Sequence, residues 1–218
     1  MVKAICRALA VGGLHFAVFL TIAFAFSPDR TTGPIILAIV LASSGFASAE
    51  TWAQARAQTD DQGLGHPLIW AAGLVLLLLL LVCLFDPWRA DPVGWWPPVV
   101  WTYAALLIAG GIGVRVLSIG TLGRRFRTDV VSLKPRELQT DGIYAHIRHP
   151  SETGLLAYAL GICVLALSPM GLALFAFAFI PLTWMRIRRE ERALLDQDHL
   201  RYGDYIERVP ALLPFSKH

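Results

Sequence analysis

Charged residues are scarce in this chain of 218 residues. Asp, Glu, Lys and Arg together make up 16% of the sequence, whereas hydrophobic residues make up 56% and the mean hydropathy is +0.56. About a quarter of a typical soluble domain is charged, so this composition indicates a polytopic membrane protein. The formal net charge of +3 is small and dispersed, which argues against a nucleic-acid partner.

Cysteine is rarer still, and its positions exclude two kinds of site. Cys6, Cys83 and Cys163 lie in or beside apolar stretches at unrelated spacings. A disulfide framework or a structural zinc site needs regularly spaced ligands, so we expect neither, and no metal. The chain also lacks internal repeats and low-complexity linkers, which predicts a single membrane domain over residues 1–218.

Long apolar runs are what the sequence does have. Several approach the roughly 20 residues that a helix needs to cross a bilayer, which predicts an all-α polytopic protein with about six transmembrane helices. Only residues 168–171 separate the last two runs, which are short, so we expect a tight carboxyl-terminal helical hairpin. The apolar runs are residues 5–26, 34–49, 68–85, 95–114, 155–167 and 171–185.

Basic residues indicate the orientation in the membrane. Lys and Arg concentrate in residues 115–148 and 186–217, and Lys3 and Arg7 lie near the amino terminus. Because basic residues favour the cytoplasmic side, we expect both segments and both termini in the cytoplasm. The same segments could bind the anionic headgroups of membrane lipids.

Two ionisable residues lie on the first two predicted helices. An ionisable residue at membrane depth is a candidate functional residue, and Glu50, on the second predicted helix directly after its apolar run, fits that description. The alternative is that Glu50 already lies at the cytoplasmic interface, on a helix that continues into water. For His15 in the first run we favour packing against neighbouring side chains.

A polar segment at residues 141–154 directly precedes the fifth apolar run. Pro150 suits the first position of a helix, so His149 is the predicted N-cap and Glu152 lies in the first turn, where the helix dipole favours an acid. Because histidine is not a favoured cap, we expect its imidazole and the Arg148 side chain to face a ligand at the free N–H groups of the helix start. The alternative is an Arg–His pair that contacts lipid phosphate.

A second charged cluster, residues 186–192, follows the sixth run, so the two clusters bracket the predicted hairpin. Glu190 and Glu191 are consecutive and point about 100° apart on a helix, so both cannot enter one pocket squarely. Arg186 precedes Glu190 by four residues and Arg188 precedes Glu191 by three, spacings at which helix side chains meet. A solvated ladder of salt bridges is therefore the alternative to a ligand site.

These motifs occur in a specific order. They are Gly142-Ile143-Tyr144, Arg148-His149-Pro150 followed by Gly154, the pair Glu190-Glu191, and a closing Tyr202-Gly203-Asp204-Tyr205 with Pro210 after it. In this combination, and in the upstream segment 120–126, the chain resembles the isoprenylcysteine carboxyl methyltransferase and phospholipid methyltransferase superfamily of integral membrane enzymes. The resemblance covers about residues 110–215. We therefore divide the domain into amino-terminal transmembrane helices (1–109) and a methyltransferase-like cofactor-binding region (110–218).

The resemblance implies an S-adenosylmethionine-dependent methyltransferase. It implies a cofactor pocket that faces the cytosol, formed by the last two helices and the flanking polar segments, and a lipophilic acceptor that enters from the bilayer. The acceptor could be a prenylcysteine-like carboxylate, a lipid amine or a thiol. The implied cofactor contacts are Tyr144, His146, Arg148, His149, Pro150, Glu190 and Glu191; the predicted catalytic residues are Arg148, Glu152 and Glu190.

Glu152 departs from the family pattern, because many relatives have Tyr two residues after the proline. A carboxylate there could bind an amine, act as a base towards a thiol or hydroxyl, or repel a carboxylate substrate. It could also serve only as a partner of the helix dipole.

Two other functions remain compatible with the sequence. A membrane reductase of sterols or related lipids could share the carboxyl-terminal helices, and would need cations such as those in residues 124–127 for the phosphates of a nicotinamide cofactor. A membrane scaffold or carrier that catalyses no reaction would keep its function after Arg148→Ala or Glu190→Ala.

Overall fold

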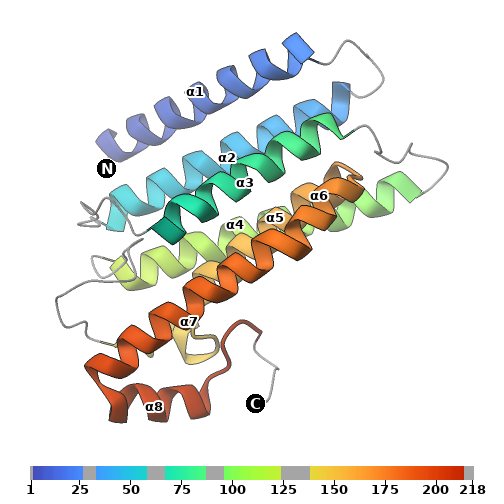
Figure 1. Ribbon diagram of the computed structural model, residues 1–218. Coiled ribbons are helices and arrows are strands. Elements are labelled where there is room, and N and C mark those ends of the chain that lie inside the picture. Colours follow the sequence, from blue (N-terminus) through green and yellow to red (C-terminus); the bar gives the residue numbers. More distant parts are fainter. Residues whose placement is uncertain (1, 27–32, 58–66, 87–95, 124–137, 214–218) are drawn as a thin grey trace.

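Six long helical segments, counted over the described residues and called rods below, pack side by side and form the body of the protein. The computed structural model describes residues 2–26, 33–57, 67–86, 96–123 and 138–213, and all regular structure within them is helical, as predicted (Figure 1). Successive rods run in opposite directions, so the start of the first and the end of the last lie at the same end of the bundle. The rods are α1 (Val2–Phe26), α2 (Gly33–Ala57), α3 (Pro67–Phe85), α4 (Trp96–Leu122), α5 (Pro150–Leu165) and the continuous run of α6 (Pro169–Leu174), η4 (Phe175–Phe179) and α7 (Ile180–Gln197).

Four of the described helices are long and apolar enough to cross a membrane. Their spans are residues 3–23, 34–56, 98–122 and 169–197, whereas the apolar parts of α3 and α5 are shorter. The prediction of a short last helix was wrong, because the helix continues through the charged cluster at residues 186–192. Arg and Glu are good helix formers, so a run of charge need not end a helix.

The predicted hairpin between α5 and α6 is confirmed, and the end of α3 closes it. Ser168 is the N-cap of α6, and its Oγ accepts a hydrogen bond from the backbone N–H of Gly171 at 2.8 Å. The same hydroxyl donates to the Asp86 carboxylate at 2.5 Å, and the Met170 N–H donates to that carboxylate at 3.0 Å. Asp86 is buried just after α3, so one acidic side chain ties α3 to the hairpin turn.

Glycines let α4 and α5 approach closely. A Cβ built on Gly154 would lie 2.6 Å from the carbonyl oxygen of Gly111 and 2.9 Å from the backbone nitrogen of Arg115. A Cβ on Gly161 would lie 2.7 Å from Cγ1 of Ile108. Small residues at a helix crossing are typical of membrane proteins, because they allow backbones to pack in direct contact.

We expect Gly154→Ala to destabilise the fold by about 1–3 kcal/mol, because its methyl group would push α4 away from the start of α5. Thermal unfolding in detergent measures the effect. Gly110→Ala is the matched control, since a Cβ on the exposed Gly110 meets nothing within 4 Å. Equal unfolding midpoints for the two variants would contradict the close crossing.

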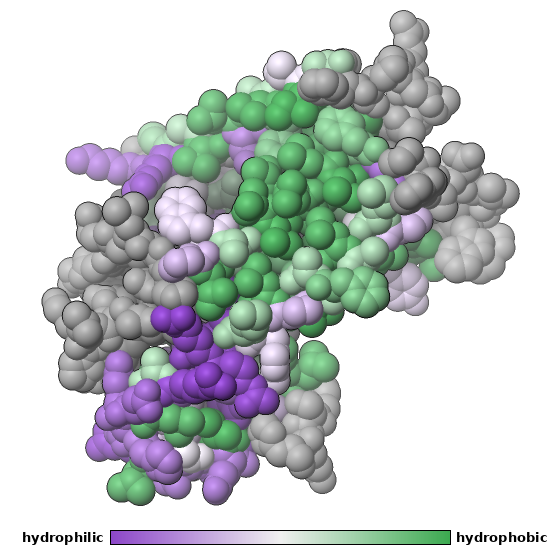
Figure 2. Space-filling model, viewed as in Figure 1, coloured by the Kyte–Doolittle hydropathy of each residue, from purple (hydrophilic) through white to green (hydrophobic). Residues whose placement is uncertain are grey.

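Beyond the bundle, a polar layer is attached at the end where α4 and α7 finish. It contains the 3₁₀ turn η3 (Gly142–Ala145) and α8 (His199–Arg208), which follows α7 after a sharp turn (Figure 1). Figure 2 shows hydrophobic residues over the bundle and hydrophilic residues gathered at this end. The chain thus separates an apolar body from one polar layer.

Candidate functional site

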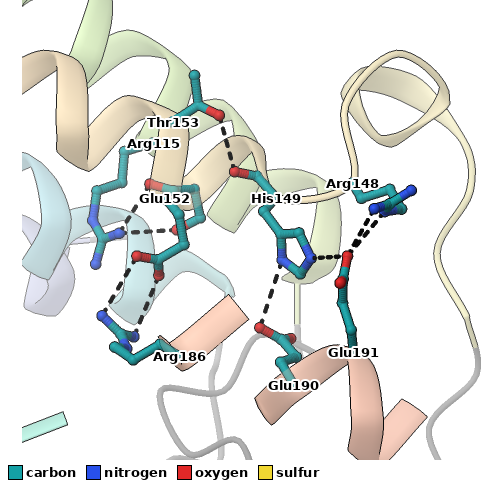
Figure 3. A network of polar contacts seen from close by, with 9 residues as sticks. Arg115, Arg148, His149, Glu152, Thr153, Arg186, Glu190 and Glu191 are labelled. Carbon is teal, nitrogen blue, oxygen red and sulfur yellow. Dashed lines mark hydrogen bonds and ion pairs between the residues drawn. The ribbon is translucent and has the colours of Figure 1, made fainter. Parts of the chain in front are cut away.

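The two charged clusters predicted from the sequence meet where the polar layer joins the bundle (Figure 3). His149 is the N-cap of α5, as predicted, and its side chain makes no capping hydrogen bond. The imidazole turns towards α7 instead, with Nε2 3.2 Å from Oε1 of Glu191 and Nδ1 3.7 Å from Oε2 of Glu190. The hairpin therefore brings the start of α5 into direct contact with the charged part of α7.

Arg148 fastens the carboxyl-terminal segment to this cluster. Its Nε and Nη2 donate to Oε1 of Glu191 at 3.1 and 2.8 Å. Its Nη1 donates to the carbonyl oxygens of Ile206 and Val209 at 2.8 and 2.6 Å. In addition, the Arg148 backbone N–H donates to the carbonyl oxygen of Pro210 at 2.9 Å. Most of the donor capacity of this guanidinium is thus used within the protein.

Glu190 and Glu191 have different surroundings. The Glu191 side chain is 12% exposed and holds Arg148 and His149, whereas the Glu190 side chain is 32% exposed. Glu190 lines a cavity of about 70 Å³ that Glu191 does not line. Of the two acids, Glu190 is therefore the one that lines the cavity.

The small cavity adjoins a larger groove of about 630 Å³ along α8, and Leu138, Leu194, Tyr202 and Tyr205 line both. Tyr144, Arg148, His149 and Glu190 complete the polar wall of the cavity. Ligand pockets usually have volumes of about 300–1,000 Å³ and combine apolar walls with a few polar groups. The groove alone has such a volume, and the small cavity lies at its polar end.

Three predicted cofactor contacts do not line the cavity, namely Glu191, His146 and Pro150. His146 is exposed at the end of η3 and is not among the residues that line it. Pro150 is buried as the first residue of α5, directly after His149. Their assignment as cofactor contacts stays a prediction.

A second pair of charges lies one helical turn from the first cluster. Arg186 on α7 faces Glu152 on α5, with Nη2 3.3 Å from Oε1, and each side chain is 12% exposed. The spacing of Arg186 and Glu190 had raised the alternative of a ladder along one helix. In the structure, Arg186 instead pairs across to α5, and Arg188 lies 4.8 Å from the ring centre of Trp184.

Arg115 is the residue that sequence reasoning missed. It was counted among the cytoplasmic basic residues, but it is buried in α4. Its Nη2 donates to Oε1 of Glu50 at 2.6 Å, and its Nη1 donates to the Ser151 hydroxyl at 2.9 Å. The rule that drew attention to Glu50, an ionisable residue directly beside an apolar run, applies equally to Arg115 and would have found it.

The two intramembrane candidates, Glu50 and His15, line a common cavity of about 340 Å³ together with Tyr158. The His15 ring stacks on Phe19 at 4.4 Å, in agreement with the predicted packing role. Glu50 has Arg115 as its partner, so it is held by the protein and does not simply extend into water.

Three buried tyrosines support the site from the polar layer. The Tyr205 hydroxyl donates to the carbonyl oxygen of Tyr144 at 2.5 Å, which ties α8 to η3. Burial raises the pKa of Tyr205 to about 12. Burial and the nearby Glu190 raise the pKa of Tyr144, and burial and the nearby Glu191 raise the pKa of Tyr202. All three phenols therefore stay neutral at physiological pH.

This cluster predicts a loss of structure in alkali. A phenol whose pKa is raised by folding stabilises the protein fully below the unfolded pKa of about 10, and the stabilisation is lost as pH rises through the folded value. We expect α8 to detach between about pH 10 and about pH 12, measured by tyrosinate absorbance together with limited proteolysis. Ionisation of these tyrosines at their ordinary pKa, with α8 still protected, would contradict the buried cluster.

Comparisons with known proteins give this geometry a family context. Residues 103–196 match the sequence model of the isoprenylcysteine carboxyl methyltransferase (ICMT) family. Protein-S-isoprenylcysteine O-methyltransferase B of Arabidopsis thaliana is 32% identical over 128 residues, which are 56% of this chain and 61% of the plant protein. The Saccharomyces cerevisiae protein-S-isoprenylcysteine O-methyltransferase is 32% identical over 112 residues, 50% of this chain and 47% of the yeast protein.

The fold is also that of a known structure. The solved structure of the eukaryotic intramembrane Ras methyltransferase ICMT superposes with a TM-score of 0.68, at 23% sequence identity, over 97% of this chain and 76% of that one. The chain spans about half to three fifths of the length of these sequence relatives. The family match favours the methyltransferase interpretation over the reductase or the carrier; the cations at residues 124–127 lie outside the described residues.

Proposed function

We propose, from the match of residues 103–196 to the sequence model of the isoprenylcysteine carboxyl methyltransferase family, that the chain is a membrane-embedded methyltransferase that uses S-adenosylmethionine on a lipophilic acceptor. The observation that carries this proposal is the cavity walled by Arg148, His149 and Glu190 at the junction of the apolar bundle and the polar layer. A water-soluble cofactor and a lipid-soluble acceptor can both reach such a junction.

The residues at the cavity fit the cofactor. S-adenosylmethionine carries an ammonium, a positive sulfonium, a ribose diol and an adenine. Glu190 offers a carboxylate to a cation or a diol, the neutral phenol of Tyr144 offers a hydrogen bond, and Leu138 and Leu194 offer apolar surface to a base. Arg148 acts by holding Glu191 and the carboxyl-terminal segment in place, and it completes the polar wall.

The chemistry asks mainly for alignment. When bound, the cofactor supplies an activated methyl group. The residues of the site would then have to keep the cofactor and the acceptor aligned with each other and to exclude competing water. We assign the cofactor side to Glu190 and His149, and the acceptor side to Glu152 one turn further into the bundle.

We propose that the polar layer, the cofactor cavity and both termini face the cytosol, and that residues 1–109 form the lipid-facing amino-terminal part of the same domain. The alternating directions of the rods support a common side for the two ends. The basic residues of α7 and α8 support the cytosolic side, because positive charge is retained there.

Transfer of a labelled methyl group tests the function. Purified protein is incubated with methyl-labelled S-adenosylmethionine and a total membrane-lipid extract, and label is counted in the organic phase. We expect incorporation by the wild type and by Glu207→Gln, an exposed acid on α8, and its loss in Glu190→Gln. Label that is absent from the organic phase with the folded wild type would contradict the proposed activity.

A further inference from the structure

Two cysteine thiols meet at the end of the bundle that lies opposite the polar layer. Sγ of Cys83 on α3 and Sγ of Cys163 on α5 are 3.9 Å apart, although 80 residues separate them along the chain. Each cysteine lies two residues before the end of its helix, close to the hairpin turn (Figure 1). Their spacing in the sequence did not predict this contact, because it follows from the packing of α3 against α5.

The surroundings hold the two thiols in place. Both side chains are 0% exposed and belong to the main hydrophobic core. A Cβ built on Gly171 would lie 2.6 Å from Sγ of Cys83, so a glycine at the start of α6 leaves room for that sulfur atom. Three residues after Cys83, Asp86 accepts the hydrogen bond from the Ser168 hydroxyl that ties α3 to the hairpin turn. The thiol pair is therefore part of a fixed junction between α3 and the hairpin.

The two sulfur atoms are close enough for a covalent bond to form with little movement. A disulfide holds its sulfur atoms about 2.05 Å apart, so the separation of 3.9 Å would have to shrink by about 1.9 Å in total. Each sulfur atom would move by roughly half of that distance. Rotation of each side chain about its Cα–Cβ bond supplies such a movement while both helices stay where they are.

The proposed orientation places this junction away from the cytosol. If the polar layer faces the cytosol, then the opposite end of the bundle, with Cys83 and Cys163, faces the other compartment. Disulfides form and persist in compartments outside the cytosol, where the environment is oxidising. Cys6 lies near the start of α1, at the cytosolic end, and is exposed. The chain thus carries its own reference thiol for the reducing side.

We propose that Cys83 and Cys163 form a disulfide that fastens α3 to α5 at the non-cytosolic end of the bundle. The oxidant is another disulfide, that of a thiol oxidoreductase in that compartment, and it acts before the helices complete their packing. Each thiol gives up one proton and one electron, the two sulfur atoms bond, and the disulfide of the oxidant is reduced to two thiols. Once packed, the new bond lies in the apolar core, out of reach of thiols in solution.

Differential labelling of the thiols in cells tests the bond. Cells that make the wild-type protein are quenched in acid, which stops thiol exchange, and the protein is unfolded in detergent with N-ethylmaleimide. After reduction, newly freed thiols are labelled with iodoacetamide and located by mass spectrometry. We expect N-ethylmaleimide on Cys6 and iodoacetamide on Cys83 and Cys163. In Cys163→Ala, Cys83 should carry N-ethylmaleimide. Wild-type protein with N-ethylmaleimide on both buried cysteines overturns the inference.

Oxidation of isolated membranes with copper phenanthroline and dioxygen then identifies what failed. A bond between Cys83 and Cys163 that forms only in this treatment means that the thiol contact is correct and the proposed orientation is wrong. No bond after this treatment means that the contact itself is wrong. Neither result affects the methyltransferase function, which is tested separately by the binding of S-adenosylhomocysteine.

Thermal unfolding in detergent tests whether the bond fastens the helices. We expect Cys163→Ala to lower the midpoint by about 5–10 °C, as for loss of a disulfide that closes a long loop. Cys6→Ala removes the exposed thiol and should leave the midpoint unchanged. A midpoint of Cys163→Ala equal to that of Cys6→Ala overturns the fastening role.

Discussion

Replacing Arg148 by alanine is expected to destabilise the protein by about 3–5 kcal/mol, the usual result of removing one partner from a buried ion pair. The change removes both hydrogen bonds to Glu191 and leaves that acid, 12% exposed, with His149 as its remaining neighbour in the cluster. It also frees the carbonyl oxygens of Ile206 and Val209, which are held by Nη1.

The loss should concentrate in the carboxyl-terminal segment. We expect Arg148→Ala to lower the thermal midpoint in detergent and to make residues after Val209 accessible to protease, with cofactor binding lost as a consequence. Arg201→Ala is the control. The Arg201 side chain is 84% exposed and its contact with Asp198 is long, at 3.7 Å, so its removal should leave the thermal midpoint unchanged. Similar midpoints for both variants would show that Arg148 does not clamp the segment.

Unlike Arg148→Ala, Glu190→Gln is expected to leave the stability of the fold intact and to weaken the binding of S-adenosylhomocysteine. The side chain is 32% exposed, and its contact with His149 is long, at 3.7 Å, so stability should change little. Loss of a hydrogen bond to a charged group is worth about 1.5–3 kcal/mol, or about 10- to 100-fold in affinity. Calorimetric titration with S-adenosylhomocysteine measures this loss.

Two variants sharpen the assignment. Glu207→Gln makes the same chemical change at an exposed position on α8 and should leave affinity unchanged. Glu191→Gln should instead resemble Arg148→Ala, because Glu191 holds Arg148 and His149 and does not line the cavity. A Glu190→Gln variant with wild-type affinity would contradict the role given to Glu190.

Local features of the structure could be read from the sequence. Apolar runs of bilayer length predict helices because an unsatisfied backbone is too costly in lipid. Pro150 predicts the start of α5, and with it the cap position of His149. The short connection before Pro169 predicts the hairpin, which brings the two charged clusters together.

Contacts between distant residues could not be predicted in the same way. Spacing along α7 suggested that Arg186 would meet Glu190, but which face of a helix meets its neighbour depends on how the helices pack. In that packing Arg186 pairs with Glu152, 34 residues away, and Arg115 pairs with Glu50, 65 residues away. The bond from Tyr205 to Tyr144 spans 61 residues and had no local signal.

The layered charges connect the fold to the proposed activity. Close packing of α4 on α5 through glycine places Arg115 beside the first turn of α5, and the hairpin places Arg186 opposite it. The cluster of Arg148, His149, Glu190 and Glu191 at the polar layer and the pair of Glu152 and Arg186 towards the bilayer then lie one turn apart. Substitutions at Glu190 and Glu152 should therefore separate cofactor affinity from acceptor chemistry.

Titration of the detergent-purified wild type with S-adenosylhomocysteine tests the central claim most directly, with NADPH titrated in parallel. We predict saturable binding of S-adenosylhomocysteine that is about 10- to 100-fold weaker in Glu190→Gln and unchanged in Glu207→Gln, and no binding of NADPH. Folded wild-type protein that binds NADPH, or that binds neither compound, would contradict the assignment of this cavity to a methyl donor.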